Sequence, residues 1–169
     1  MEKAYITYGT YDFLEKIKLK FKNEKMILIY NNDHALLFHE TNGRTKFQMP
    51  RRFEIIESLN DIPKKCFIVI NHVPIPEEAK PVFEYELKMR KTIEHTQGFR
   101  AIRILRPIKS DTYFIMTFWE NEALFEKMKS DLSFFAKNHV LPIEISNSIH
   151  AQEPSYIRTY YLNENNHDN

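Results

Sequence analysis

Apolar residues along the chain follow two spacings, one typical of short strands and one typical of helices. Residues 3–9 are predicted to form a strand, and the apolar positions within residues 13–21 then recur at helical spacing. Because residues 17–22 also alternate with a period of two, the end of this element stays open between helix and strand. Short apolar runs at residues 26–30 and 35–39 predict two further strands.

A turn and one more helix complete the pattern of the first half. The Asn-Gly step within residues 41–44 favours a hairpin turn that leads into a short strand at residues 45–49. A second helix is expected next, with Phe53, Ile56 and Leu59 on one side.

The second half starts again with an apolar strand at residues 66–73, which Pro74 ends. A helix that begins near Pro81 is expected to run to about His95, because Gly98 then resets the backbone.

Two long strands and a further helix follow. The strands are predicted at residues 99–106 and 112–119, and both faces of the second are largely apolar, as in a strand covered on both sides. Asn121 is expected to cap a helix that residues 134–139 continue after an interruption. Residues 155–162 predict the last strand.

This order of elements predicts an α+β protein made of two ferredoxin-like units in one chain. We place an abbreviated N-terminal unit at residues 1–64, a complete C-terminal unit at residues 65–162 and a polar tail at residues 163–169. Helices cover one side of each sheet in such units, which leaves the other side apolar. The two units could cover these sides for each other and close a barrel within one chain.

Composition and charge restrict the class of protein. The 169 residues are 43% hydrophobic, enough for one compact domain or two fused halves with a sizeable core. The formal net charge of +1 favours neither nucleic acid nor an anionic membrane as a partner. No apolar run approaches the roughly 20 residues that span a bilayer, and the N-terminus lacks an apolar secretory segment. We therefore expect a cytoplasmic protein.

Aromatic residues make up 14% of the chain, which indicates either a thick aromatic core or a lined cavity for a flat ligand. Cys66 is expected to be a buried small hydrophobe, and Trp119 to be structural because it ends an apolar strand. Five histidines lack the spacing of a metal site and are expected at the surface: His34, His39, His95, His150 and His167.

Several motifs resemble the antibiotic biosynthesis monooxygenase (ABM) superfamily. They are GFRAIRILRP at residues 98–107, SDTY at 110–113, WE at 119–120, YITYGT at 5–10, HETNG at 39–43 and PSY at 154–156. The resemblance extends over nearly the whole chain, to the long, single-chain heme-degrading monooxygenases of Bacillus type (HmoB-like) and to the related target of RNAIII-activating protein (TRAP). It implies a ferredoxin-like dimeric α+β barrel formed within one chain, with a heme pocket in the second half.

The resemblance also assigns roles to two residues by position. The catalytic asparagine of the family falls on Asn71, whose amide could donate a hydrogen bond to iron-bound oxygen. A strand-end amide that bonds nearby backbone is the alternative. The catalytic tryptophan falls on Met128, a thinner and more flexible side chain, which is otherwise interpreted as helix-face core. His72 is expected to point away from Asn71, because neighbouring strand residues face opposite sides.

The iron-binding histidine of the family falls on Asn138 when residues are counted without a gap, and amides are poor iron ligands. A one-residue insertion within residues 129–133 would instead bring His139 into register, and its imidazole is a good axial ligand for heme iron. The two alignments stay open.

Three functions follow from the resemblance. The first is a heme-degrading monooxygenase that uses heme as cofactor and substrate, with molecular oxygen and an external electron donor such as a reductase, and that releases iron. The second is a non-catalytic signalling or stress-response protein of the TRAP kind, which the departures at Met128 and Asn138 favour. The third is an enzyme acting without metal on another aromatic molecule. Since both units lie in one chain, a monomer is expected.

Overall fold

The computed structural model describes residues 2–89, 93–130 and 155–164 of this protein. Its strands are β1 (Lys3–Gly9), β2 (Met26–Tyr30), β3 (Ala35–Thr41), β4 (Arg51–Leu59), β5 (Lys65–Pro74), β6 (Phe99–Pro107), β7 (Thr112–Trp119) and β8 (Tyr156–Asn163). They close into one barrel in the order β1-β3-β2-β8-β5-β7-β6-β4, and each pairs antiparallel with its neighbours.

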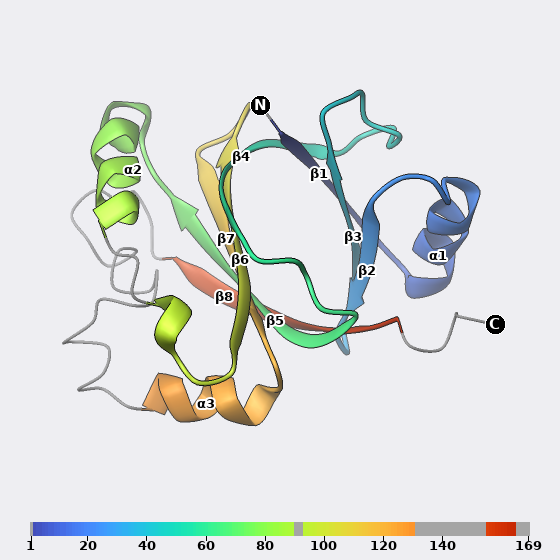
Figure 1. Cartoon of the computed structure of the whole chain (residues 1–169). Helices are drawn as coiled ribbons and strands as arrows, with labels where there is room; N and C mark the ends of the chain where they lie inside the picture. The colour runs from blue at the N-terminus through green and yellow to red at the C-terminus, as the bar shows by residue number, and fades with distance from the viewer. Residues whose placement is uncertain (1, 90–92, 131–154, 165–169) are drawn as a thin grey trace.

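Helices lie outside the barrel on two sides (Figure 1). Helix α1 (Tyr11–Lys20) lies beside β2 and β3, whereas α2 (Lys80–Met89) and α3 (Glu122–Ser130) lie on the side of the second half. Short 3-10 turns, η1 (Glu77–Ala79) and η2 (Ile93–His95), flank α2. None of the helices in the described ranges is long and apolar enough to cross a membrane.

The barrel contains the same strand order twice. The first quartet runs β4-β1-β3-β2 and the second runs β8-β5-β7-β6, so in each the fourth strand lies beside the first. This is the order of a ferredoxin-like unit. Residues 42–50 join β3 to β4 without a helix, which makes the first unit the shorter one. The predicted α+β barrel of two ferredoxin-like units in one chain is confirmed.

Two local predictions in the first half are wrong. Residues 45–49 form no strand, and Phe53, Ile56 and Leu59 lie on strand β4 rather than on a helix. The pairing of β4 with β6 shifts register between Ile55 and Glu57, and this irregularity interrupts the strand's alternation. Strand β4 also pairs with β1, so it is the element that closes the barrel. The ambiguous stretch before Phe21 is helical.

Apolar side chains fill the barrel interior. Where the strands are regular, alternate residues point inward, for example Ile68 and Ile70 of β5 and Phe114, Met116 and Phe118 of β7, and all of these are fully buried. The intervening residues point outward under the helices. The outer faces therefore form separate clusters beneath α1, α2 and α3.

Candidate functional site

The outer face of β5 carries a buried polar side chain between two apolar clusters. Phe67 and Val69 pack in the cluster beneath α3, and Val73 packs in the cluster beneath α2. Asn71 lies between them on the same face, whereas His72 points into the barrel and contacts Phe114. The expectation that Asn71 and His72 face opposite sides is therefore confirmed.

Asn71 has no hydrogen-bond partner among the residues that the structure describes. Its side chain is 2% exposed, and both Oδ1 and Nδ2 lack a partner there. Val69 and Val73 flank it along the strand, and its cross-strand neighbours are the apolar residues Ile115 and Ile157. Leaving a buried amide unpaired costs about 1–3 kcal/mol per polar group. Within the described ranges, the alternative that Asn71 bonds nearby backbone is not observed.

Met128 lies on the same outer face, on α3. It is 6% exposed and packs in the cluster with Phe67, Val69 and Phe125. Because Val69 is also a neighbour of Asn71, this cluster connects the two candidate residues. The packing agrees with the interpretation of Met128 as core.

Trp119 is structural, as expected. The ring is fully buried, and its Nε1 donates a 2.9 Å hydrogen bond to Thr117 Oγ1. The Thr117 hydroxyl in turn lies 3.5 Å from the Val69 carbonyl oxygen. The indole N–H is satisfied by the chain, so it is not available to a ligand.

Helix α3 is held in place by its start and by a close backbone approach. Asn121 caps it, since Oδ1 accepts a 2.9 Å hydrogen bond from the Leu124 amide. Gly98 has a φ of 89°, and a Cβ at this position would lie 2.6 Å from Leu124 Cβ. Only glycine allows α3 to approach the start of β6 this closely.

Helix α2 is fixed to the sheet by a charged cluster. The Arg106 guanidinium donates two hydrogen bonds to Glu84, at 2.9 and 2.6 Å, and the Tyr113 hydroxyl donates a third. Burial acts to raise the pKa of Glu84, but these donors outweigh it and lower the pKa below its usual value. Sequence reasoning missed this cluster, because its members come from α2, β6 and β7 and no local spacing connects them.

The remaining candidates lie elsewhere. Burial raises the pKa of Cys66 to about 12, as expected for an inert buried thiol. His39 contradicts the expectation of a surface position, since it is fully buried and its Nε2 lies 2.9 Å from Glu24 Oε2. Its position on β3 beneath Phe47 and α1 buries it.

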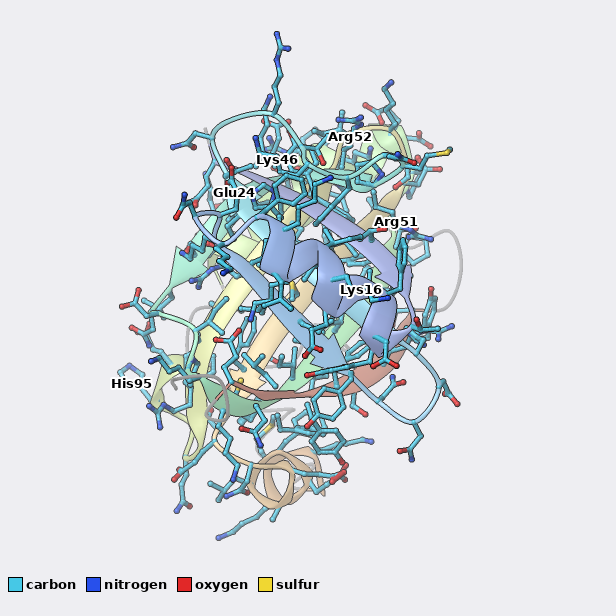
Figure 2. All side chains as sticks on the ribbon, turned by 90° about the vertical axis from the view of Figure 1, so that its right-hand side faces the viewer. Lys16, Glu24, Lys46, Arg51, Arg52 and His95 are labelled. Carbon is cyan, nitrogen blue, oxygen red and sulfur yellow. The ribbon has the colours of Figure 1, made fainter. Side chains whose placement is uncertain are left out.

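Of the other histidines expected at the surface, the structure describes His34 and His95. His34 is partly buried and its Nε2 lies 2.9 Å from the Tyr160 hydroxyl, whereas His95 is exposed at the edge of the molecule (Figure 2). Asn138, His139, His150 and His167 lie outside the described residues. In the ranges that the structure describes, no three His, Cys, Asp or Glu side chains form a group able to hold a metal ion.

Comparisons with known proteins agree with this architecture. Residues 66–131 match the family described as antibiotic biosynthesis monooxygenase (ABM). The signal transduction protein TRAP of Staphylococcus aureus (strain MSSA476) is 27% identical over 135 residues, which cover 79% of this chain and 81% of that protein. The chain is therefore similar to the ABM family within its second half, and the resemblance to the ABM superfamily and to TRAP is confirmed.

Two solved structures extend the likeness to the whole barrel. One, described as a major regulator of staphylococcal pathogenesis, has a TM-score of 0.82 at 25% identity and covers 97% of this chain and 99% of its own. The other, LmHde, a heme-degrading enzyme from Listeria monocytogenes, has a TM-score of 0.69 at 17% identity and covers 95% of this chain and 99% of its own. The second likeness concerns the fold alone.

Proposed function

We propose that this protein binds heme on the helix-covered outer face of its second unit and degrades it by oxidation in the cytoplasm, releasing iron. The observation that carries the proposal is the Asn71 amide, which is 2% exposed and has no partner for either polar atom among the described residues. An unpaired buried amide carries a desolvation cost, and a catalytic or ligand-binding role is one of the explanations for such a group in a native protein. The heme-degrading neighbour with the same fold supports heme as the ligand.

The residues around Asn71 suit a flat, largely apolar ligand with one polar centre. Val69, Val73 and Ile115 are apolar neighbours of the amide, and such low-polarity surroundings would strengthen a hydrogen bond to it. When bound, heme supplies the iron and the macrocycle that react with molecular oxygen and electrons from an external donor or reductase. The Asn71 Nδ2 would then donate a hydrogen bond to an oxygen atom there.

Met128 would lie beside the bound ligand, because it belongs to the same apolar cluster as Val69. Its thioether fills space without imposing a rigid plane, so it presses on a flat ligand less than an aromatic ring does. We therefore infer that distortion of the ligand adds little to the rate of heme oxidation here, and that the Asn71 hydrogen bond adds most.

The axial ligand stays a prediction from the resemblance, with His139 and Asn138 as the two candidates. Hemin-reconstituted His139→Ala and Asn138→Ala variants separate them, with the exposed His95→Ala as the matched control. If His139 binds iron, only His139→Ala should change the Soret and ligand-field spectra. An unchanged spectrum in His139→Ala would reject this residue as ligand.

A second function is a non-catalytic heme-binding or regulatory protein. Two observations favour it: Met128 is packed as core at the position of the family tryptophan, and the relatives at 27% identity are named signal transduction protein TRAP. Hemin titration followed by ascorbate in air distinguishes the two functions. A Soret band that bleaches with iron release supports the enzyme, whereas a Soret band that persists supports the regulatory protein.

Asn71→Leu tests the role of the buried, unpaired Asn71 amide directly. It should keep hemin binding but slow bleaching about 100-fold, the loss typical when one preorganised donor is removed. Because leucine is of similar size and has no polar atoms to satisfy, the apoprotein should also become more stable, by about 1–3 kcal/mol in urea unfolding. The exposed Asn42→Leu is the matched control for both measurements. A destabilised Asn71→Leu with normal bleaching would contradict the role of the amide.

A further inference from the structure

The end of the barrel where β1 and β5 finish contains a small cavity unrelated to Asn71. It has a volume of about 230 Å³. Its walls come from four strands and one loop: Tyr8, His34, Arg51, His72, Tyr156 and Arg158. Since His72 faces the barrel interior and Asn71 faces the helices, this cavity and the proposed heme site lie on opposite sides of β5.

Two guanidinium groups at this cavity have no counter-ion in the described part of the chain. Arg51 lies over aromatic rings, with its Cζ 5.8 Å from the centroid of Tyr8 and 5.6 Å from that of Phe114. Arg158 lies 5.5 Å from the ring centroid of Tyr156. Among the described residues no carboxylate forms an ion pair with either arginine. The rings orient the guanidinium groups but leave their N–H donors available.

His72 forms the buried floor of the cavity and stays neutral. Its ring stacks on Tyr156 at 4.3 Å with an interplanar angle of 10°, and Nδ1 lies 3.3 Å from the Tyr156 carbonyl oxygen. Burial lowers the pKa of His72 to about 4, and the positive charges of Arg158 and Arg51 contribute. Both guanidinium groups are therefore close enough to act on this imidazole.

We propose that this end of the barrel binds the phosphate or carboxylate group of a small molecule between Arg51 and Arg158. Two guanidinium groups without a carboxylate partner among the described residues are complementary to an oxyanion, which each can bind through paired N–H donors. The volume of about 230 Å³ is below the range of roughly 300–1,000 Å³ typical of drug-sized ligands, so it admits an ion or one small ring. The rings of Tyr8 and Tyr156 suit a planar or compact ligand at the same place.

Titration of the full chain with inorganic phosphate and with benzoate tests this proposal. Isothermal calorimetry at constant ionic strength should give saturable binding of at least one of them, with sodium chloride as the reference. Tighter phosphate binding would indicate a phosphate-bearing ligand, and tighter benzoate binding an aromatic carboxylate. Absence of saturation by both at millimolar concentration would overturn the proposal.

Neighbouring arginines provide a matched control. Arg51 and Arg52 follow each other in sequence, but Figure 2 shows their side chains at different places on the molecule, and Arg52 lies over Tyr5 on the outer face. Arg51→Gln and Arg158→Gln should each weaken oxyanion binding at least tenfold, whereas Arg52→Gln should leave it unchanged. Equal weakening in all three variants would mean that net charge, rather than this cavity, attracts the ion.

A second readout does not depend on variants. The ring protons of His72 should shift in NMR spectra on phosphate or benzoate binding, while those of the exposed His95 should not. Binding without a shift at His72 would place the oxyanion elsewhere and contradict the proposal.

Discussion

The two ends of the barrel differ in whether their arginines are paired with a carboxylate of the described residues. At the end where β3 and β4 finish, the buried Arg103 donates a 2.8 Å hydrogen bond from Nε to Glu40 Oε1, and Lys25 Nζ lies 2.8 Å from Oε2 of the same carboxylate. At the other end Arg51 and Arg158 lie over aromatic rings, and neither forms an ion pair with a carboxylate among the described residues.

The difference separates charge used for the fold from charge available to a ligand. Arg103 and Glu40 are 2% and 4% exposed, and the Nη1 of Arg103 also donates to the carbonyl oxygens of Leu59, Asn60 and Ile102. A buried ion pair with these extra hydrogen bonds closes one end of the barrel. The other end is left positive and open.

The largest effect is expected from Glu40→Ala. Removing one partner leaves the Arg103 guanidinium buried without its counter-ion, so the free energy of unfolding should fall by about 3–5 kcal/mol in urea titration. The Glu40→Leu/Arg103→Met double variant is the control. It should recover most of the loss, because apolar side chains of similar volume replace the whole pair. A double variant as unstable as Glu40→Ala would mean that the end is closed by the ion pair specifically.

A smaller loss of stability is expected when His72, at the open end of the barrel, is exposed to acid pH. The pKa of His72 is about 4 in the folded protein and near 6.5 in the unfolded chain, so between these values the unfolded chain binds the extra proton. Stability should therefore fall as the pH falls from 6.5 towards 4, with about 3 kcal/mol from this residue at the lower limit. Burial, followed by the charge of Arg158, also lowers the pKa of His34, which adds to the loss in the same direction.

His72→Phe keeps an aromatic ring against Tyr156 but cannot titrate. Urea unfolding at pH 4.5 and pH 7 should show a smaller difference in this variant than in the unaltered protein. An equal difference would show that the acid sensitivity comes from other groups.

The smallest effect is expected from Lys25→Ala. The Lys25 side chain is 61% exposed, so its ion pair with Glu40 is screened by water and should contribute about 0.5 kcal/mol. Thermal unfolding of Lys25→Ala and of the exposed Lys16→Ala should give nearly the same midpoint. A loss that approached that of Glu40→Ala would mean that Lys25, rather than Arg103, neutralises the carboxylate.

Much of the second half follows from local pattern. Strands β5 and β7 carry apolar residues on both faces, and their alternation places Asn71 and His72 on opposite sides without any knowledge of the fold. The cap at Asn121 was also predictable, because its side chain bonds a residue only three positions away. In the first half, the register shift in β4 disturbed the same kind of pattern and made a strand resemble a helix.

The sequence by itself determined the succession of most elements, the two-unit barrel and the position of Asn71, because each depends on neighbouring residues or on motifs. Only the tertiary structure decided that β4 closes the barrel, that Asn71 lacks a partner within the described residues and that Arg51 and Arg158 gather around His72. Pairing of strands and of charges joins residues far apart in the chain, as Glu40 and Arg103 are 63 positions apart. Hydrophobic periodicity records which side of an element is buried, but it does not record what lies opposite.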